Sequence, residues 1–367
     1  MLELEVREDE KPGTSIYVAR AQDADTGKNG LIVYQLQNSP LGLFSIDETS
    51  GEITLNQVLD YETRKEYQLT VTATDRGFPP QFTSMNFTVK VKDVNDNPPV
   101  FDREIYDFYV PENVKIGEVI DQVHATDRDS DYNSRISYSF VDNKYTSLFS
   151  ISLSEGKIWT RDYLDRETHD TYEMTVRAVD HGTPRPMSAT TLIRVFVQDV
   201  NDNAPTFDRD AYRFSIFENL PAESSVGKVI AYDPDMGRNS KLQFFFSGSQ
   251  SNFTIDSENG EIRTKIPLDR EHMSEHYLTV FVQDSAELPK TARTEVKIIV
   301  KDDNDNKPVF QRVGPYQQSV SENRPKGTLV MQLVAHDPDQ GDNGLVTYTF
   351  DESKICFMFL ILSLVSR

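Results

Sequence analysis

An acidic pentapeptide that recurs about every hundred residues is the feature that most restricts how this chain can fold. It occurs three times: DVNDN at 93–97, DVNDN at 199–203 and DDNDN at 302–306. A glutamate that ends a short strand-like run recurs in the same phase, at spacings of 104, 106 and 104 residues: Glu8, Glu112, Glu218 and Glu322. A period this long indicates a series of complete domains, each with its own core, and argues against a solenoid of small repeats.

Further acidic anchors lie between each glutamate and the pentapeptide that follows it. Asp-x-Asp pairs come first, each with an asparagine four residues after the second aspartate: Asp23/Asp25/Asn29, Asp127/Asp129/Asn133, Asp233/Asp235/Asn239 and Asp337/Asp339/Asn343. LDYE or LDRE segments follow: Asp60/Glu62, Asp165/Glu167 and Asp269/Glu271. Single aspartates then end longer runs: Asp75, Asp180 and Asp284. The fourth unit stops near Phe350, before its later anchors.

The segments between these anchors read as β-strands. Residues 68–75, 173–180 and 277–284 alternate apolar and polar side chains with a period of two, as half-buried strands do. Glycine-containing turns join shorter runs, as in FSIDETSGEITL at 44–55. The pattern predicts an all-β fold of tandem Greek-key, immunoglobulin-like sandwiches, three complete and one truncated. Trp159 lies in one of these runs, and we predict that it belongs to the core.

Charge and composition restrict the function. The chain of 367 residues carries a formal net charge of −21, which argues against nucleic-acid binding and suits either cation binding or a soluble surface. The single cysteine, Cys356, excludes an internal disulfide framework. The N-terminus lacks the basic and apolar parts of a signal peptide. An 11-residue apolar run at 355–365 is shorter than the roughly 20 residues of a spanning helix, so we expect a fragment or truncated product of a larger protein.

The order of these anchors resembles that of extracellular cadherin repeats from residue 1 to about residue 350. The strand ends ATDRGFPP and AVDHGTPR are more similar to protocadherin or Fat/Dachsous-type repeats than to classical ones. The resemblance implies the following division: repeat 1 at 1–99, repeat 2 at 100–205, repeat 3 at 206–308, a partial repeat 4 at 309–354 and an apolar tail at 355–367.

The resemblance also implies Ca²⁺ ligands where consecutive repeats meet, with about three ions at each complete junction. For the first junction these are Glu8, Asp60, Glu62, Asp93, Val94, Asn95, Asp96, Asn97, Asp127, Asp129, Asn133 and Asp180. For the second they are Glu112, Asp165, Glu167, Asp199, Val200, Asn201, Asp202, Asn203, Asp233, Asp235, Asn239 and Asp284. For the third they are Glu218, Asp269, Glu271, Asp302, Asp303, Asn304, Asp305, Asn306, Asp337, Asp339 and Asn343. Backbone atoms are the expected ligands at Val94, Asn97, Asn133 and Asp303.

Electrostatics leads to the same cation independently. The first two junctions hold eight carboxylates each by this count, and two like charges about 4 Å apart repel by about 1 kcal/mol even in bulk water. Oxygen ligands without histidine or cysteine select hard cations, and about six to eight oxygens for each ion favour Ca²⁺ over Mg²⁺. We therefore expect linkers that are flexible without calcium and rigid with it, stiffened at Pro98 and Pro99.

Two locations depart from the full pattern. Asp23, Asp25, Asn29 and Asp75 have no preceding repeat in this chain to complete their site, so we expect weak calcium binding there or none. The third junction lacks a counterpart of Asp180 and Asp284, because the fourth unit is cut short. We expect that site to be incomplete.

The function that the resemblance implies is calcium-dependent cell–cell adhesion on the extracellular side of the plasma membrane, with homophilic or heterophilic cadherin ectodomains on apposed cells as partners. The chain has no tryptophan near its start, so strand exchange of the classical type has no support. Alternatives are a rigid extracellular spacer and, in another class, a calcium-dependent hydrolase. Asn86 and Asn252 lie in glycosylation sequons, which count only in a secreted chain.

Competing motif interpretations fail on position. An EF-hand beginning at Asp337 requires glutamate at its twelfth residue, where this chain has Tyr348. HMSEH at 272–276 fits a zinc-protease pattern that requires a helix, but its equivalents TRKEY and THDTY lead into predicted strands. A glycosidase needs one carboxylate pair in one cleft, whereas the acidic set recurs at every domain boundary. We therefore expect no enzymatic activity.

Overall fold

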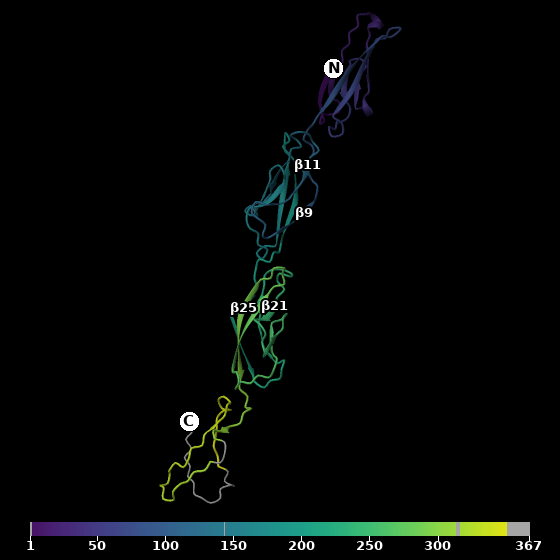
Figure 1. Ribbon diagram of the computed structural model, residues 1–367. Helices are drawn as coiled ribbons and strands as arrows, with labels where there is room; N and C mark the ends of the chain where they lie inside the picture. The colour runs from purple at the N-terminus through teal and green to yellow at the C-terminus, as the bar shows by residue number, and fades with distance from the viewer. Residues whose placement is uncertain (1, 143, 313–315, 351–367) are drawn as a thin grey trace. The chain divides into compact units, whose positions relative to one another are not determined.

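The computed structural model describes residues 2–142, 144–312 and 316–350 (Figure 1). The chain divides into two compact units, residues 1–199 and 200–367, and each is described by itself. Strands dominate both units; within the described ranges the helical turns are η1 (Gly27–Gly30) and η2 (Pro40–Gly42). The described residues form no helix that could span a membrane. Cys356 and the predicted tail at 355–367 lie outside the described residues.

Two β-sandwiches make up the first unit. The strands of the first sandwich are β1 (Leu2–Arg7), β2 (Ser15–Val18), β3 (Val33–Gln37), β4 (Phe44–Ile46), β5 (Glu52–Leu55), β6 (Glu66–Thr74) and β7 (Phe82–Lys92). They form a four-stranded sheet in the order β1-β7-β6-β3 and a three-stranded sheet in the order β2-β5-β4. The core between these sheets includes Ile53, Leu55, Phe87 and Val89, all at most 1% exposed.

The second sandwich repeats this plan and adds a short strand pair. Its strands are β8 (Val100–Phe101), β9 (Ile105–Pro111), β10 (Val119–Gln122), β11 (Ala125–Thr126), β12 (Ser137–Phe140), β13 (Phe149–Ile151), β14 (Lys157–Thr160), β15 (Thr171–Val179) and β16 (Ser188–Gln198). The sheets have the orders β12-β15-β16-β9 and β10-β14-β13, with β11 paired to β8. Figure 1 labels β9 and β11 in this sandwich.

The second unit contains a third sandwich of the same topology. Its strands are β17 (Thr206–Phe207), β18 (Ala211–Phe217), β19 (Ser225–Lys228), β20 (Ala231–Tyr232), β21 (Gln243–Phe246), β22 (Phe253–Ile255), β23 (Glu261–Thr264), β24 (Glu275–Gln283) and β25 (Thr291–Lys301). The sheets have the orders β18-β25-β24-β21 and β19-β23-β22, with β17 paired to β20. Beyond them, β26 (Val309–Phe310) pairs with β27 (Ala335–His336).

The first long strand of each sandwich runs parallel to its last strand. β1 pairs with β7, β9 with β16 and β18 with β25, whereas the other pairings are antiparallel. Backbone hydrogen bonds continue past the strand ends, from the N–H groups of Glu8, Glu112 and Glu218 to the carbonyls of Lys92, Gln198 and Lys301 at 3.0–3.1 Å. Parallel pairing therefore brings each strand-ending glutamate beside the pentapeptide that begins one residue after its partner strand.

The alternation predicted for the strands is confirmed in β15 and β24, and in β6 except at the buried Thr72, whereas the placement of the tryptophan is not. In β15 the buried side chains alternate with half-buried or exposed ones along the whole strand. In β14 Ile158 and Thr160 are fully buried, whereas Trp159 is only half-buried and faces the other side of the sheet. The prediction that Trp159 belongs to the core is wrong, because successive side chains of a strand point to opposite faces.

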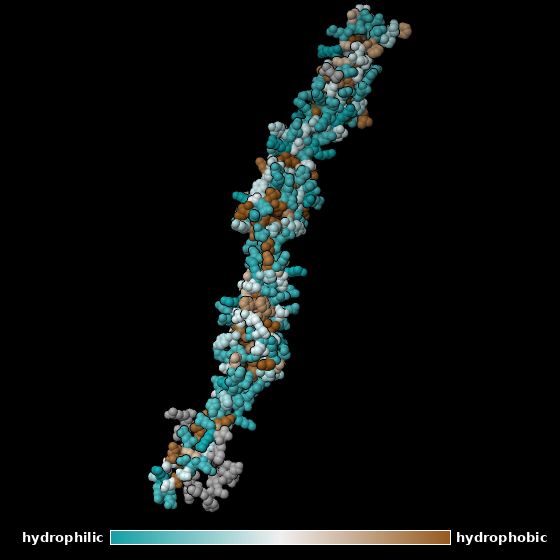
Figure 2. Space-filling view, in the orientation of Figure 1, coloured by the Kyte–Doolittle hydropathy of each residue, from teal (hydrophilic) through white to brown (hydrophobic). Residues whose placement is uncertain are grey.

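Two other sequence-based interpretations concern local structure. The HMSEH segment forms a turn that leads into β24, whose first residue is Glu275, so the helix that a zinc protease requires is absent from these described residues. The face shown in Figure 2 is mostly hydrophilic, with hydrophobic side chains scattered over it, in agreement with the net charge of −21. The domain boundaries at 99, 205 and 308 stay predictions.

Candidate metal centres

A buried glutamate holds two loops together at the end of the first sandwich. Glu8 is 2% exposed, and its carboxylate accepts hydrogen bonds from the N–H of Tyr61 at 2.7 Å and of Val94 at 2.6 Å. Tyr61 belongs to the LDYE segment and Val94 to the pentapeptide. Glu8 therefore joins two other recurring anchors, although they lie 53 and 86 residues from it in the sequence.

Carboxylates gather tightly around this glutamate. One oxygen from each of Glu8, Asp60 and Glu62 lies within 4.8 Å of the other two, and Glu62, Asp93 and Asp129 form a second such group. Two oxygens bound to one Ca²⁺ at about 2.3–2.6 Å lie at most about 5 Å apart. Both groups are therefore compact enough to share a single ion.

The environment of this cluster disfavours negative charge. Burial, with the charges of Glu8, Asp96 and Asp129, raises the pKa of Glu62 to about 7. Burial also raises the pKa values of Glu8, Asp96 and Asp129. Each of these carboxylates is stabilised by losing its charge or by gaining a positive neighbour, so a bound cation would relieve the repulsion.

Hydrogen bonds join the first pentapeptide to the second sandwich. The carboxylate of Asp93 accepts from the N–H of Ser130 at 3.2 Å and from the Nδ2 of Asn133 at 2.7 Å. The Nδ2 of Asn97 donates to Asp129 Oδ1 at 2.7 Å. Side chains at both ends of the pentapeptide therefore contact the Asp-x-Asp loop of the following sandwich.

The central asparagine of the first pentapeptide lies against a third loop. Asn95 Nδ2 donates to Asp180 Oδ1 at 3.3 Å and to the carbonyl of Arg185 at 2.9 Å. Asp180 is 1% exposed and follows β15. A Cβ atom on Gly182 would lie 2.0 Å from the Asn95 side chain, so only glycine permits this close approach.

Several buried ligand-type oxygens lack a hydrogen-bond donor among the described residues. These atoms are Glu62 Oε1, Asn95 Oδ1 and Asp127 Oδ2 in the first unit, and Asn201 Oδ1 and Asp235 Oδ2 in the second. Leaving a buried polar oxygen unsatisfied costs about 1–3 kcal/mol, and more when it is charged. All five belong to the predicted ligand set, and their chemistry fits a hard cation.

The third junction repeats the geometry of the first. Glu218 is 2% exposed and accepts from the N–H groups of Arg270 at 2.7 Å and Asp303 at 2.8 Å. Oxygens of Glu218, Glu271 and Asp302 lie within 4.8 Å of one another. Burial raises the pKa of Glu218, as it does that of Glu8. Asp303 contacts this cluster through its backbone N–H.

Contacts from the third pentapeptide to the partial fourth unit follow the same scheme. Asp302 accepts from the N–H of Gln340 at 2.8 Å and from Asn343 Nδ2 at 2.9 Å. Asn306 Nδ2 donates to Asp339 Oδ1 at 2.8 Å. Asn304 is exposed, unlike the half-buried Asn95, and no counterpart of Asp180 exists in the sequence. The remaining predicted ligands here are Asp269, Asp305 and Asp337.

The two halves of the second junction belong to different units. In the first unit, Glu112 is 2% exposed and accepts from the N–H of Arg166 at 3.0 Å, and Asp165 accepts from Thr168 Oγ1 at 2.7 Å. In this half, the Arg166 side chain of the LDRE segment forms ion pairs with Glu167 and Asp199.

The second unit contains the other half of that junction. Asn203 Nδ2 donates to Asp202 at 2.8 Å and to Asp235 at 2.9 Å. Asn201 Nδ2 donates to Asp284 Oδ2 at 3.2 Å, and Asp284 is fully buried. The remaining predicted ligands of this half are Val200, Asp233 and Asn239.

The acidic pair that lacks a preceding repeat differs in burial. Asp23 and Asp25 are exposed, whereas Asp129, Asp235 and Asp339 are 5–7% exposed. Exposed carboxylates lose little by remaining in water, so they gain less from a cation than the buried ones do. The expectation of weak binding or none at Asp23 and Asp25 stays a prediction.

Three side chains at these sites were missed by the sequence analysis. Arg166 and Arg270, the third residues of the two LDRE segments, direct their guanidinium groups at predicted ligands. Asn219 Nδ2 donates to Asp305 Oδ2 at 2.7 Å. The difference between LDYE and LDRE was visible in the sequence, but the side-chain direction was not.

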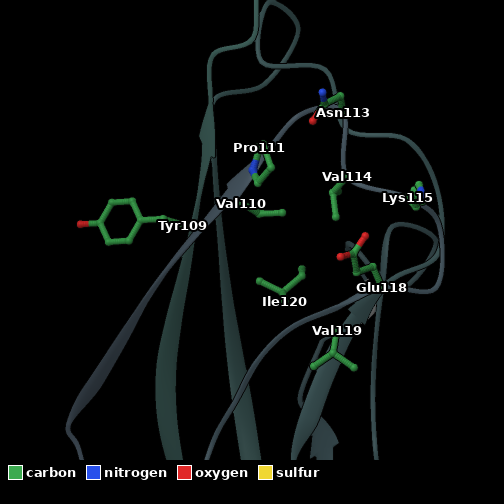
Figure 3. A pocket seen from close by; sticks show the side chains of 9 residues that line it. All are labelled: Tyr109, Val110, Pro111, Asn113, Val114, Lys115, Glu118, Val119 and Ile120. Atoms are coloured by element: carbon green, nitrogen blue, oxygen red, sulfur yellow. The ribbon is translucent and has the colours of Figure 1, made fainter.

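A hollow in the second sandwich offers no comparable set of ligands. It lies by β9 and β10 and is lined by Tyr109, Val110, Pro111, Asn113, Val114, Lys115, Glu118, Val119 and Ile120 (Figure 3). Glu118 is the one carboxylate among these described lining residues, and apolar side chains form most of the rest. This hollow therefore lacks the carboxylate pair that a glycosidase requires.

Comparison with known proteins identifies the class that these sandwiches and acidic junctions define. Residues 2–92, 106–198 and 212–301 match the cadherin domain. The chain belongs to the cadherin family, and the predicted fold of tandem cadherin β-sandwiches is confirmed.

Relatives of the predicted type are among the most similar proteins. Protein dachsous of Drosophila melanogaster is 41% identical over 367 residues, covering 96% of this chain and 10% of that protein. Protocadherin Fat 1 of Homo sapiens is 41% identical over 342 residues, covering 92% of this chain and 7% of that protein. The resemblance to protocadherin and Fat/Dachsous-type repeats is confirmed, and the chain spans a tenth or less of the length of these two relatives.

Solved structures show the same repeat architecture. Mouse cadherin-23 EC22-24 is 34% identical with a TM-score of 0.70, covering 82% of this chain and 95% of that chain. Protocadherin gammaB7 EC3-6, solved as a cis-dimer, is 30% identical with a TM-score of 0.75, covering 94% of this chain and 83% of that chain.

Proposed function

We propose that the acidic junctions bind Ca²⁺ and that the bound ions hold consecutive cadherin repeats together. The observation that carries this proposal is the set of buried, unpartnered oxygens at Glu62, Asn95 and Asp127, of which Glu62 also belongs to two groups of carboxylates spaced to share an ion. A divalent cation supplies the positive charge that these groups lack. Side chains from both repeats then coordinate the same ions.

At the first junction the full predicted set would hold the ions, with about three Ca²⁺ for the eight carboxylates. The third junction presents the same clamp and the same linker contacts, so we extend the proposal to it. For the second junction the proposal rests on its sequence, which contains every anchor of the first. The predicted boundaries at 99, 205 and 308 are part of this proposal, since each directly follows a pentapeptide and its proline.

The proposed cellular role is calcium-dependent cell–cell adhesion on the extracellular side of the plasma membrane, with cadherin ectodomains on apposed cells as partners. Membership of a family of adhesion proteins supports this role and favours a non-enzymatic function. The chain covers 10% and 7% of the length of these two relatives, so the activities of the full-length proteins are not assigned to it. A rigid spacer, with its adhesive surface in other repeats, is the alternative in the same class.

Bead aggregation tests adhesion directly. Beads coated with the chain should aggregate in millimolar Ca²⁺ and disperse in EGTA, and beads coated with an Asp129→Ala, Asp235→Ala double variant should aggregate less. A calcium-loaded chain whose beads never aggregate would support the spacer and contradict homophilic adhesion. Mixed beads that carry a second cadherin ectodomain would detect a heterophilic partner.

A further inference from the structure

Three equivalent residues occupy the middle of the LDxE segments. The backbone N–H groups of Tyr61, Arg166 and Arg270 donate to Glu8, Glu112 and Glu218 at 2.7, 3.0 and 2.7 Å, respectively. Their backbones therefore occupy the same place in each sandwich. The three positions differ in the side chain alone, which is a neutral phenol once and a guanidinium twice.

Both guanidinium groups bridge two predicted calcium ligands. Arg166 Nε lies 2.7 Å from Asp199 Oδ1, and its Nη2 also contacts Glu167. Arg270 Nη1 lies 2.8 Å from Glu271 Oε1 and 3.0 Å from Asp302 Oδ1. In each repeat the bridged pair joins the LDRE glutamate to the first aspartate of the pentapeptide.

These ion pairs are shielded from water. The arginine side chains are 10% and 15% exposed, and the four carboxylates are 12–19% exposed. Exposed pairs on the sheets, such as Lys92–Glu5 at 57% and 61%, are far more hydrated. Shielded charges interact more strongly than hydrated ones, so each arginine contributes a substantial positive field at its cluster.

Among the described residues, no arginine forms an ion pair with the predicted ligands of the first junction. Tyr61 occupies the equivalent position, and the Lys65 ammonium lies over the Tyr61 ring, 4.8 Å from its centre. At the third junction, by contrast, Arg270 contacts two of the three carboxylates that are close enough to share an ion. The arginine there therefore pairs with carboxylates that a metal ion would also require.

We propose that Arg166 and Arg270 act as tethered counter-ions, which hold the carboxylates of their clusters together without calcium and lower the affinity of those clusters for calcium. The inference rests on the proposed calcium binding. It predicts two kinds of junction in one chain. The tyrosine junction binds calcium more tightly and opens further on chelation, whereas the arginine junctions bind it less tightly and stay more ordered when calcium is removed.

Coulomb's law sets the size of the effect. A unit charge about 5 Å from a divalent ion changes its binding constant by about tenfold when the medium is as polar as water, and by more where it is shielded. Salt and side-chain rearrangement reduce this value. We expect affinity changes of about three- to thirty-fold.

Hydrogen exchange read by mass spectrometry resolves each linker in the full chain. Peptides covering 92–100, 198–206 and 301–309 are followed through a Ca²⁺ titration from EGTA to 10 mM. Arg166→Tyr should lower the calcium midpoint of the 198–206 peptide about three- to thirty-fold and speed its exchange in EGTA. Tyr61→Arg should do the reverse to the 92–100 peptide. Arg161→Tyr, which makes the same charge change at a guanidinium that donates to the Thr146 carbonyl, should leave the 198–206 midpoint unchanged.

Two results with Arg166→Tyr would overturn the inference. An unchanged or raised midpoint in Arg166→Tyr would mean that the arginine does not compete with calcium, and unchanged exchange in EGTA would mean that it does not hold the cluster. Should Arg166→Tyr fail to fold, Tyr61→Arg carries the same decision at the first junction. If no wild-type linker responds to calcium, the proposed function fails, while the EGTA comparison still tests whether the arginine holds the cluster.

Discussion

The side-chain amide of Asn97 donates a 2.7 Å hydrogen bond to the carboxylate of Asp129, and this bond connects the end of one linker to the loop of the next sandwich. The bond from Asn306 to Asp339, at 2.8 Å, is its counterpart at the third junction. Both aspartates are 7% exposed. The second carboxylate oxygen of each aspartate accepts a longer hydrogen bond, at 3.4 Å, from the backbone N–H of the same asparagine. These two bonds fix the loop against the linker.

Replacement of Asp129 tests this arrangement. Asp129→Ala should lower calcium affinity at the first junction by at least about tenfold, the loss that even an outer-shell partner causes at metal sites. The calcium dependence of hydrogen exchange in peptide 92–100 measures it. Asp25→Ala is the matched control, because Asp25 holds the same position in the first repeat but is exposed. Equal effects of the two variants would contradict the assignment of Asp129.

Chelation should expose the linkers to proteases. Without a cation the eight carboxylates of the first junction repel one another, so EGTA should increase cleavage at 93–99 and, to a smaller extent, at 199–206. Limited proteolysis followed by mass spectrometry locates the cuts, with cleavage inside the sandwiches as the internal control. Linkers that are cut at the same rate with and without calcium would rule out a rigid calcium-bound linker.

Adjacent residues of β14 should differ in their effect on stability. Ile158 is fully buried, so Ile158→Ala should lower the free energy of unfolding of the second repeat by about 2–5 kcal/mol. Trp159→Ala removes a larger side chain from the half-buried face and should cost less than about 2 kcal/mol. Urea unfolding in excess calcium compares them, and a larger loss for Trp159→Ala would overturn the description of the two faces.

The third repeat should be sensitive to mild acid through His276. This residue is 8% exposed and packs edge-on against Phe253, with 5.0 Å between ring centres; Tyr67 and Tyr172 hold its position in the other repeats. Burial lowers the pKa of His276 below its ordinary 6.5. Below that pH the unfolded chain takes up a proton that the folded chain does not, so the stability contribution present at pH 7.5 is lost as pH falls.

His276→Tyr isolates that contribution. Urea unfolding of both proteins at pH 7.5 and 5.5 in excess calcium measures the free energy of unfolding. The wild-type third repeat should lose more stability on acidification than the variant, because carboxylates common to both cancel in the comparison. Equal losses would show that His276 carries no pH dependence.

Sequence reasoning predicted the strands well because their signal is local. β15 and β24 follow the alternation seen at 173–180 and 277–284, and β6 follows that at 68–75 except at the buried Thr72. Trp159 was misplaced because Ile158 and Trp159 are both apolar and adjacent, so residue type could not tell which one faces the core. Which of the two faces the core depends on how side chains alternate between the two faces along the whole strand.

The sequence named candidate ligands but not their contacts. The resemblance to cadherin repeats implied that Glu8, Asp93 and Asp129 belong to one ligand set, and that assignment stays a prediction. Their convergence depends on the parallel pairing of β1 with β7, which no local pattern contains. The direction of the Arg166 side chain depends on several torsions and on neighbouring charges, so a sequence shows the arginine without its partners.

Calcium binding to the purified chain is the most direct test of the central claim. Equilibrium dialysis against ⁴⁵Ca²⁺ counts the bound ions, and the account predicts saturable binding of several ions for each chain, with about three lost when Glu62 and Asp96 are both replaced by alanine. Unfolding in urea checks that the double variant keeps its sandwiches. A folded chain that binds no Ca²⁺ at millimolar concentration, or a double variant that binds as many ions as the wild type, would contradict the account.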